Sequence, residues 1–444
     1  MIQPRQVPTV VLVNPSTSWR CGIGHLIYTS SPPLGLGYLA AALRDDGYKV
    51  AIVDLQVSSK AYLFQAIKEL RPIFVGLTCQ MGTYRTAFRL AHEIKSRFGI
   101  PIVMGGPHVS CQPAPMISSG AVDVVVRGEG EHVIKLIART IAEDAKCFSD
   151  IAGLSYVDRG SIIHTPDPTP IGNLDEIPFP ALNLLPLHLY RPGANRRIPR
   201  PFIPMITSRG CPYGCRYCSS AAVFGKTTRY RSVQNIQKEV RHWRSQLGEY
   251  GLMIWDDTFT LKRKRALELC DMLQAEKVEW CCTTRPDVLD QELLSAMYRA
   301  GCRFLYFGAE SFDTGMLHGL GRTTTPEQAR TAAAMVMSSG IKTSVGIVTR
   351  LPGQTLRDIV NDVKALFGLW VDYPTINILS EYENKQSAQS SGAVDTGDPG
   401  RRPIADSKTR PNRWIVRALR IVALISYYVA VRLRRIFLSV PRRG

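Results

Sequence analysis

The sequence predicts an α/β protein in which a doubly wound, Rossmann-like domain precedes a partial TIM-type barrel of six βα units. Short apolar strands alternate with helical segments along two long stretches of the chain. The strands are rich in valine and isoleucine, which is typical of parallel sheets covered on both faces. The second series repeats about every forty residues and ends after six units, whereas a complete barrel needs eight.

The first series of strands and helices lies within residues 7–145. Strands are expected at 10–13, 49–54, 73–78, 101–106 and 122–126, and helices at 34–44, 84–98 and 131–143. Small residues stand at the ends of these strands, among them Thr78, Gly105, Gly106 and Gly128. Doubly wound sheets bind their ligands at this edge. Because no Gly-x-Gly-x-x-Gly motif follows the first strand, a dinucleotide site is not indicated.

Residues 151–200 are expected to connect the two series. A small hairpin is predicted over 154–164, and a proline-rich stretch follows it. The second series then occupies residues 201–380. Its strands are expected at 202–207, 252–256, 278–283, 304–307, 343–348 and 375–379, and its helices at 232–246, 263–275, 291–300, 326–339 and 355–369.

The chain ends in a polar linker, 383–412, and a basic amphipathic helix, 413–440. Between Arg401 and Gly444 there are twelve Lys and Arg residues against one acid, so this stretch supplies +11 of the net charge of +18. Its longest uncharged run has eleven residues, and a membrane span needs about twenty. We expect the helix either to lie at an anionic membrane surface or to pack on the barrel. Nucleic-acid binding is not expected, because the charge is confined to a strongly apolar helix.

Three cysteines, Cys211, Cys215 and Cys218, follow the first strand of the second series with the spacing Cys-x3-Cys-x2-Cys. Barrel chemistry gathers at this end of the strands. The eleven cysteines are scattered and the N-terminus lacks the apolar core of a secretory signal, which favours reduced thiols and a cytoplasmic protein. Structural zinc and iron–sulfur clusters normally take four protein ligands. Three thiolates would leave one iron of a cluster free for an external ligand, and the alternatives are a degraded zinc site or cysteines that stand together by chance.

The cysteine motif, with Tyr217 before its last cysteine, resembles that of the radical S-adenosylmethionine (radical SAM) superfamily. The resemblance implies a 4Fe–4S cluster on the three cysteines, with the open iron chelating the amino and carboxylate groups of S-adenosylmethionine. It also implies that the reduced cluster splits S-adenosylmethionine into methionine and a 5′-deoxyadenosyl radical.

Further segments are similar to the same family and imply contacts with S-adenosylmethionine. Residues 255–260 contain Asp257, residues 307–311 contain Glu310, and residues 346–355 begin with Gly346. Arg285, after the third strand, would bind the methionine carboxylate. Each residue has an ordinary alternative as a helix cap, a turn residue or a surface ion pair. None is assigned a catalytic role.

Some of the barrel departs from the family pattern. Arg350 stands where glycine is usual, and Gln354 stands where glutamate is usual. The family's last segment carries a Pro-x-Pro-Gly-Thr stretch, whereas this chain passes into the polar linker soon after Asp372. Because of these departures, the sequence leaves open whether an enzyme with this shortened barrel end is catalytically active.

The first series resembles the cobalamin-binding domain that a subset of this superfamily carries. The matching segments are 14–15, 31–40, 76–80, 105–108 and 126–131. The Asp-x-His-x-x-Gly motif of other cobalamin proteins is absent, which agrees with this subset. The resemblance implies cobalamin beside Thr78, Gly105, Gly106 and Gly128, with His108 either facing the corrin or bonded to its own turn.

Two cofactors together imply a radical methyltransferase that methylates an unactivated carbon of a small-molecule or lipid-like biosynthetic intermediate. A radical oxidoreductase or cyclase without methyl transfer, and a non-catalytic cobalamin- or cluster-binding protein, are the alternatives. The expected partners are the substrate, an electron donor such as flavodoxin or ferredoxin, and a membrane surface at the C-terminal helix. The sequence names neither the substrate nor the oligomeric state.

Overall fold

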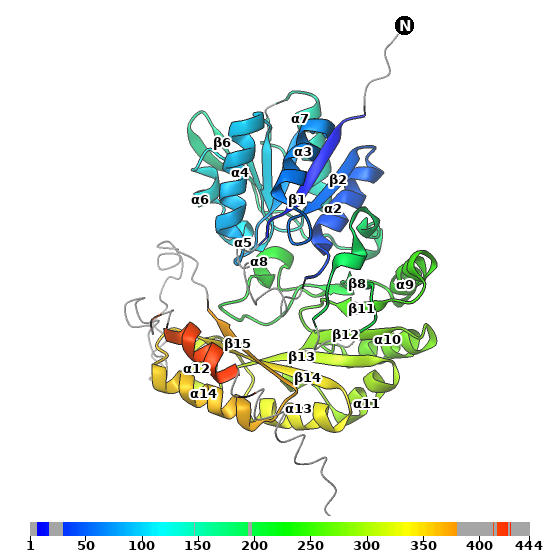
Figure 1. Cartoon of the computed structure of the whole chain (residues 1–444), viewed down its shortest axis with the longest axis vertical. Helices are drawn as coiled ribbons and strands as arrows, with labels where there is room; N and C mark the ends of the chain where they lie inside the picture. The colour runs from blue at the N-terminus through cyan, green and yellow to red at the C-terminus, as the bar shows by residue number, and fades with distance from the viewer. Residues whose placement is uncertain are drawn as a thin grey trace, which may run out of the picture. The chain divides into compact units, whose positions relative to one another are not determined.

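The computed structural model describes residues 7–16, 30–145, 147–193, 198–379, 412, 415–424 and 427 of the chain. The chain divides into two compact units (Figure 1). The first contains residues 1–212 and 219–257, and the second contains residues 213–218 and 258–444. This division falls inside the second βα series, so the domain boundaries expected from the sequence stay a proposal.

The first unit contains a sheet with the strand order β2-β1-β3-β4-β5-β6-β7. Its strands are β1 (Thr9–Asn14), β2 (Lys49–Asp54), β3 (Phe74–Thr78), β4 (Ile102–Gly105), β5 (Val124–Val126), β6 (Leu154–Asp158) and β7 (Ser161–His164). The helices around it are α2 (Leu34–Asp45), α3 (Lys60–Leu70), α4 (Tyr84–Phe98), α5 (Pro107–Cys111), α6 (Ala114–Ile117) and α7 (Glu131–Ala142). Strands β1 to β5 pair in parallel in the order 2-1-3-4-5, which confirms the doubly wound class.

Two features of this sheet differ from the expectation. Helix α3 was not predicted, although the Ser59 hydroxyl caps its N-terminus by accepting from the Tyr62 N–H at 3.1 Å. The predicted hairpin is present as β6 and β7, but β6 pairs antiparallel with β5. The hairpin therefore extends the N-terminal sheet, because it satisfies the backbone groups of an otherwise open edge.

The proline-rich connector folds back on the same unit. It forms three short 3₁₀ turns, Leu174–Glu176, Leu182–Leu184 and Leu187–Leu189. The buried Tyr190 hydroxyl donates to the Asp54 carboxylate at 2.8 Å, at the end of β2. The Ala181 N–H donates to the Gly37 carbonyl of α2 at 2.9 Å. These contacts hold the connector against the N-terminal sheet and its helices.

The first unit also contains the start of the second series. Strands β8 (Phe202–Met205) and β11 (Gly251–Ile254) pair in parallel, and helix α9 (Val233–Leu247) lies between them in sequence. Two short strands, β9 (Ser208–Arg209) and β10 (Arg229–Tyr230), form an antiparallel ribbon at the end of β8. Helix α8 (Ser220–Phe224) follows the cysteine motif. Neither the ribbon nor α8 was predicted, since both are too short for a periodic signal.

The second unit contains four parallel strands, β12 (Glu279–Thr284), β13 (Cys302–Glu310), β14 (Lys342–Thr349) and β15 (Tyr373–Ile378). Its helices are α10 (Arg263–Ala275), α11 (Gln291–Arg299), α12 (Thr314–Gly319), α13 (Pro326–Ser338) and α14 (Leu356–Gly368), with a 3₁₀ turn at Pro286–Val288. Figure 1 shows α11, α13 and α14 along one side of these strands. All six strands predicted for the second series are present, so the α/β fold class is confirmed.

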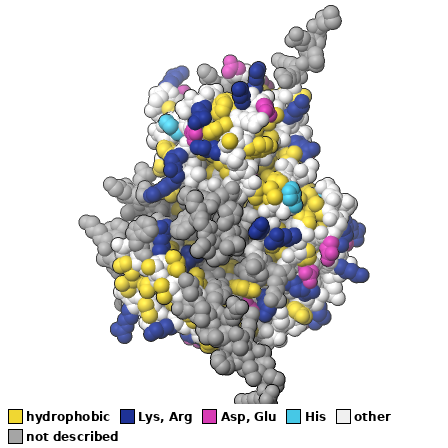
Figure 2. All heavy atoms as spheres, viewed as in Figure 1, with side chains coloured by type: hydrophobic (Ala, Val, Ile, Leu, Met, Phe, Trp, Pro, Cys, Tyr) yellow, Lys and Arg dark blue, Asp and Glu magenta, His cyan; other side chains and the backbone are white. Residues whose placement is uncertain are grey.

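Part of the predicted C-terminal helix is described. Residues 415–424 are helical, and Val416 is buried. Tyr427 is also buried, and its hydroxyl donates to the Val371 carbonyl while its ring lies 4.7 Å from that of Phe367. Ile421 and Val422 are 57% and 63% exposed. Figure 2 shows hydrophobic side chains gathered at the lower left of the molecule. No helix among the described residues is long and apolar enough to span a membrane.

The predicted linker, apart from residue 412, lies outside the described residues, as do the two ends of the predicted C-terminal helix.

Candidate functional site

The cysteine motif begins at the end of the β9–β10 ribbon. Gly210 has φ of +91°, and an added Cβ there would clash with the Thr227 carbonyl. The Cys211 N–H donates to the Gly225 carbonyl at 3.4 Å, and the Cys218 N–H donates to the Cys215 carbonyl at 3.1 Å. Only glycine fits this combination of left-handed backbone and close contact, so Gly210 sets the course of the loop.

The three thiols suit an iron–sulfur cluster in their chemistry. Cys211 and Cys215 are half-buried, and Cys218 is exposed. Cys79, Cys270, Cys281, Cys282 and Cys302 are by contrast buried. In the described part of the chain, no three cysteine, histidine or acidic side chains are close enough to hold a metal ion. The fit therefore rests on the donor set, which is three accessible thiols within eight residues.

Two adjacent acids after β11 have different partners. Asp256 is buried and accepts from the backbone N–H and hydroxyl of Thr207 at 2.6 and 2.5 Å, and from Ser208 at 3.1 and 2.6 Å. Asp257 is the residue predicted to contact S-adenosylmethionine, and it accepts from the Ser220 hydroxyl at the start of α8. Desolvation by the surrounding protein raises the pKa of Asp257. Asp256 therefore fixes the end of β8, and Asp257 contacts the helix that follows the cysteines.

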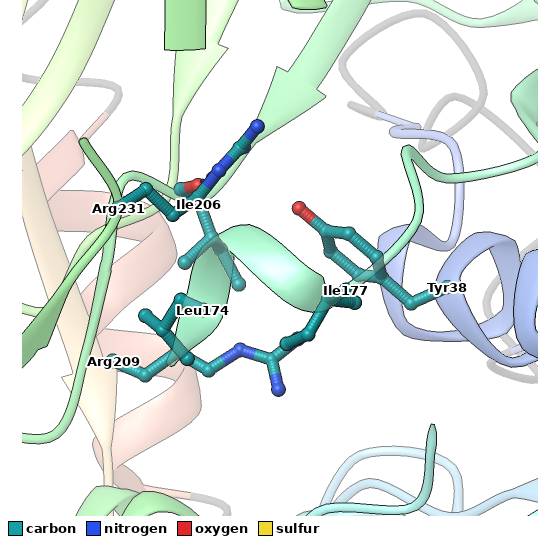
Figure 3. Close-up of a pocket in the computed structure, with 6 residues that line it drawn as sticks. All are labelled: Tyr38, Leu174, Ile177, Ile206, Arg209 and Arg231. Carbon is teal, nitrogen blue, oxygen red and sulfur yellow. Dashed lines mark hydrogen bonds between the residues drawn. The ribbon is translucent and has the colours of Figure 1, made fainter. Parts of the chain in front are cut away.

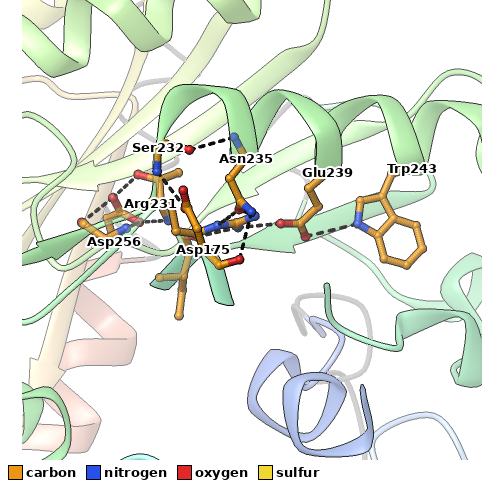
Figure 4. A network of polar contacts seen from close by, with 10 residues as sticks. Asp175, Arg231, Ser232, Asn235, Glu239, Trp243 and Asp256 are labelled. Atoms are coloured by element: carbon orange, nitrogen blue, oxygen red, sulfur yellow. Dashed lines mark hydrogen bonds and ion pairs between the residues drawn. The ribbon is translucent and has the colours of Figure 1, made fainter. Parts of the chain in front are cut away.

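A second polar network holds the start of α9, as Figure 4 shows. The Arg231 guanidinium donates to the Ile206 carbonyl at 3.0 Å and pairs with the buried Glu239 carboxylate at 2.5 Å. The Ser232 N–H donates to Asp175 of the connector at 2.9 Å. This network ties the end of β8, the connector and α9 together within the first unit.

A small pocket lies beside this network (Figure 3). It is lined by Tyr38, Leu174, Ile177, Ile206, Arg209 and Arg231. Arg231 pairs with Glu239, and Arg209 pairs with Glu129 and Glu131. Both cations of the pocket are thus neutralised by buried acids, and the remaining walls are mostly apolar.

In the second unit, Tyr217 and Glu310 meet at an arginine that the sequence did not single out. One amino group of the buried Arg322 donates to the Gly308 carbonyl at 2.5 Å. The other amino group lies 3.3 Å from the Tyr217 hydroxyl, 3.7 Å from the Glu310 carboxylate and 4.0 Å from the Cys215 sulfur. Nε of Arg322 is buried and has no hydrogen-bond partner among the described residues. Arg322 thus connects the cysteine motif with the end of β13.

Burial changes the acid–base properties of this group. It raises the pKa of Glu310, an effect that the Arg322 charge and the Tyr217 hydrogen bond oppose. Burial, followed by the negative charge of Glu310, also raises the pKa of Tyr217. The Tyr217 phenol is therefore kept protonated beside the Glu310 carboxyl group. Because this site is desolvated, both groups interact more strongly with a bound charge than they would in water.

A β-bulge directs Glu310 out of the sheet. The pairing of β13 with β14 changes register between Gly308 and Glu310. Glu310 has φ of +68°, a left-handed conformation that is unusual for glutamate, and its carboxylate occupies the space that a Cβ at Gly308 would fill. Bulges of this kind often re-aim a side chain beside a functional site.

Arg285 is buried and already paired. Its guanidinium makes a bidentate contact with Asp287 at 2.8 and 3.0 Å and donates to the Thr323 hydroxyl at 3.2 Å. Its guanidinium carbon lies 3.4 Å from the centre of the Tyr213 ring, which belongs to the cysteine motif. The ion pair considered from the sequence is therefore present, but it is buried and stacked on the motif.

The fifth-strand segment has mainly structural contacts. An added Cβ at Gly346 would clash with the Tyr306 hydroxyl. Arg350 has φ of +63°, which explains why glycine is usual at that position. Gln354 is buried, and its amide donates to the buried Asp362 carboxylate at 3.1 Å. An amide can donate to Asp362, whereas a glutamate carboxylate there would repel it.

The N-terminal candidates lie together at the ends of β3, β4 and β5. Gly106 has φ of +108°, and an added Cβ would come within 2.9 Å of the Cys79 carbonyl and 3.1 Å of the Thr78 hydroxyl. Gly105 ends β4. Gly128 has φ of +76° and follows β5. The structure thus brings these small residues to one edge of the sheet, as the ligand-binding rule for such sheets requires.

His108 lies in the first turn of the short helix α5 at this edge. Its N–H donates to the Cys79 carbonyl at 3.1 Å, and its ring stacks on Tyr84 with centroids 4.9 Å apart. Burial lowers the pKa of His108, so that the neutral imidazole is favoured. The backbone bond to Cys79 ties α5 to the residue after β3, and whether the His108 ring faces the corrin stays a prediction.

Comparison with known proteins assigns the two halves of the chain. The family model described as B12 binding domain matches residues 21–138, and that described as Radical SAM superfamily matches residues 205–366. A protein of Pyrococcus horikoshii named an uncharacterized methyltransferase is 31% identical over 383 residues, which cover 85% of this chain and 82% of that protein. The chain belongs to the cobalamin-dependent radical SAM enzymes.

Other similar proteins include a cyclase and further methyltransferases by name. An anaerobic magnesium-protoporphyrin IX monomethyl ester cyclase of Rubrivivax gelatinosus is 27% identical, and the match covers 80% of this chain and 67% of that protein. A hopanoid C-3 methylase of Methylococcus capsulatus is 26% identical over 72% of this chain and 62% of that protein. The radical SAM methyltransferase TsrM of Kitasatospora setae has the same fold, with a TM-score of 0.66 and 20% identity over 84% of this chain and 72% of that one.

As a cobalamin-dependent radical SAM enzyme, the chain uses cobalamin, S-adenosylmethionine and a 4Fe–4S cluster. The predicted cobalamin contacts lie at one edge of the N-terminal sheet. Of the predicted S-adenosylmethionine contacts, Tyr217 and Glu310 lie together. Arg285 stacks on the cysteine motif, Asp257 lies beside α8, and Gly346 lies within β14. Arg322 is the residue that sequence reasoning missed. It stands in a loop after α12 without any periodic pattern, and only the tertiary fold brings it to Tyr217 and Glu310.

Proposed function

We propose that this enzyme transfers a methyl group to an unactivated carbon of a small-molecule or lipid-like biosynthetic intermediate. The cluster, on Cys211, Cys215 and Cys218, would supply the electron that cleaves S-adenosylmethionine to a 5′-deoxyadenosyl radical, and cobalamin would carry the methyl group. The observation that carries the radical chemistry is the meeting of Cys215 and Tyr217 with the buried Glu310 and Arg322. The methyltransferases among the relatives support the transfer.

The residues of the second unit have chemistry that suits S-adenosylmethionine. Glu310 is a buried acceptor for the ammonium group of its methionine part. Arg322 has a buried Nε without a described partner, and this N–H is available to an anionic group. Arg285 is held by Asp287 and stacked on Tyr213, so its proposed role is to position the cysteine motif. These assignments are part of the proposal.

At the edge of the N-terminal sheet, the small residues leave the backbone accessible to a flat macrocycle. Thr78, Gly105, Gly106 and Gly128 would line the cobalamin site, with the stacked His108 in its wall. The neutral imidazole of His108 would offer a polar group to the corrin without adding a charge.

Anaerobic reconstitution with iron, sulfide, cobalamin and a reductant tests this function. The native enzyme should convert S-adenosylmethionine to 5′-deoxyadenosine, and Cys215→Ala should abolish this conversion. Cys270→Ala is the matched control, because this buried cysteine belongs to α10 and not to the motif. A complete cluster that forms no 5′-deoxyadenosine would overturn the radical assignment and favour a non-catalytic binding protein.

A second candidate function is a radical cyclase or oxidoreductase without methyl transfer. The cyclase among the relatives favours it. S-adenosylmethionine with a labelled methyl group distinguishes the two functions. If 5′-deoxyadenosine forms but the label reaches neither cobalamin nor a product from cell extract, the methyltransferase proposal fails and the cyclase or oxidoreductase is favoured.

Two partners complete the proposal. A small electron carrier such as flavodoxin or ferredoxin would reduce the cluster. The test is whether the reduced carrier can replace the chemical reductant in the 5′-deoxyadenosine assay. Residues 415–424 would contact an anionic membrane surface. Their exposed face carries Ile415, Leu419 and Val422, and no acid follows Asp406 in the chain.

A further inference from the structure

Two acids and two arginines form a buried ionic group in the first unit, beside the edge proposed for cobalamin. Glu129 lies in the turn after β5 and Glu131 begins α7, and their side chains are 3% and 8% exposed. The two amino groups of Arg209 pair with Glu129 at 2.7 Å and with Glu131 at 2.5 Å. Arg209 stands two residues before Cys211. One guanidinium thus joins the turn after β5 to the base of the cysteine motif.

Arg229 binds the same carboxylate from the other strand of the ribbon. It is the register partner of Arg209 in the β9–β10 pair. One of its amino groups lies 2.7 Å from Glu129, and the other donates to the Phe224 carbonyl at the end of α8 at 2.8 Å. Because α8 follows Cys218 in sequence, the segments on both sides of the motif are tied to Glu129.

Ring contacts fix the orientation of Arg209. Its guanidinium carbon lies 5.2 Å from the Tyr38 ring centre and 5.4 Å from that of Phe224. Figure 3 shows Arg209 and Tyr38 on the same pocket. The two positive and two negative charges balance, so removal of any one of them leaves an uncompensated buried charge.

Direct packing adds a second connection between the same parts. The Gly128 N–H donates to the Ser110 hydroxyl of α5 at 3.0 Å. A Cβ at Gly128 would lie 3.6 Å from the Val223 carbonyl of α8, and α5 itself packs against α8. The edge that carries Gly106, His108 and Gly128 therefore contacts the helix that follows the cysteines.

We infer that Glu129, Glu131, Arg209 and Arg229, the ionic latch, couple cobalamin binding to the conformation of the cysteine motif. The latch joins the edge proposed for cobalamin to the backbone before Cys211 and after Cys218, the proposed cluster ligands. Ordering of the cobalamin site therefore favours ordering of the cysteine motif, and the reverse. The inference rests on the proposed function for the identity of the two cofactor sites. By linkage, the cluster must then affect cobalamin affinity by the same factor as cobalamin affects the cluster.

Alkylation of the cysteines tests the latch without any catalysis. The cluster-free full chain is treated anaerobically with iodoacetamide, with and without saturating methylcobalamin in dim light, and mass spectrometry follows each cysteine. Methylcobalamin should slow the alkylation of Cys211 about fivefold or more. The exposed Cys147 reports the reagent itself, and its rate should not change.

Latch variants separate coupling from binding. In Glu129→Gln, methylcobalamin should still bind, as its absorbance spectrum shows, but should no longer slow the alkylation of Cys211. Arg209→Lys keeps the positive charge but cannot bind Glu129 and Glu131 with two separate amino groups. It serves as the milder variant if Glu129→Gln does not fold. Glu239→Gln is the matched control, because this buried acid pairs with Arg231 and not with the turn after β5; it should keep the slowing.

The contrary outcomes are distinct. The inferred coupling would be wrong if Cys211 of the native chain were alkylated equally fast with and without bound methylcobalamin. It would also be wrong if methylcobalamin slowed the alkylation of Cys211 in Glu129→Gln as much as in the native chain. Neither result would contradict the proposed cobalamin site. Failure of the native chain to bind methylcobalamin would overturn the cobalamin assignment of the proposed function, and the inference with it.

Discussion

At the scale of single residues, Arg322 is the cation on which the candidate site of the second unit depends. Its guanidinium holds the Gly308 carbonyl and lies beside Tyr217 and Glu310. We expect Arg322→Met to destabilise the protein by about 3–5 kcal/mol, because the variant leaves the buried Glu310 without its cation. The free energy of unfolding in urea measures the change.

A double-variant cycle tests the pairing itself. Glu310→Gln in the Arg322→Met background should recover part of the loss, since a neutral amide does not need the cation. Purely additive losses would show that Arg322 stabilises the protein through Gly308 alone.

Asp362 gives a pH-dependent contribution to stability. Burial raises the pKa of Asp362 to about 6, from about 3.9 in an unfolded chain. The folded protein therefore holds this proton more tightly, and the contribution is present below about pH 4 and is lost as the pH rises through about 6. The stability of the native protein relative to Asp362→Asn should fall by about 2–3 kcal/mol over this window. A difference that is constant in urea unfolding between pH 4 and 7 would contradict this assignment.

At the scale of elements, the β9–β10 ribbon determines how the cysteine motif begins. Gly210→Ala places a Cβ against the Thr227 carbonyl in a left-handed backbone, so we expect a loss of about 1–3 kcal/mol or a displaced loop. The reconstituted variant should hold less iron than the native protein. Gly214→Ala is the matched control in the same motif, since no atom lies within 4 Å of its added Cβ. Equal iron content in the two variants would show that the ribbon does not position the motif.

The elements also show what could be predicted from the sequence. The strands of both predicted series are mostly apolar runs of three to nine residues. They were predicted because such runs have to be buried against helices. The α3 helix was missed despite its Ser59 cap. The partners of β6, the two-residue strands β9 and β10, and the bulge before Glu310 depend on tertiary pairing and leave no periodic trace.

The candidate site divides in the same way. Tyr217 and Glu310 lie in motifs with recognisable residue order, and the fold brings them to one arginine. Arg322 was not found, because a single arginine in a loop has no signal until its neighbours are known. Gln354 looked like a departure from a functional pattern, but its contact with Asp362 makes it part of the core of the second unit.

At the scale of the whole molecule, the charge is concentrated at the C-terminus. Residues 401–444 supply +11 of the net charge of +18. In the described helical part of this stretch, Val416 is buried on one face, and Ile421 and Val422 are exposed on the other. One face is thus used within the second unit while the other is apolar and flanked by Arg417 and Arg420, a combination that suits an anionic lipid surface.

Vesicle binding tests this surface. The full chain should co-sediment with phosphatidylcholine vesicles that contain phosphatidylglycerol, and less with phosphatidylcholine alone, since each basic residue near such a surface contributes about 1 kcal/mol. The double variant Ile421→Asp/Val422→Asp should lower the partition coefficient about tenfold or more, because it removes apolar contact and adds repulsion. Leu136→Asp is the control, since Leu136 is 43% exposed on α7 in the other unit. Equal partitioning of the double variant and the control would leave the exposed face without a membrane role, whereas selective loss would favour a substrate that the enzyme meets at the lipid surface.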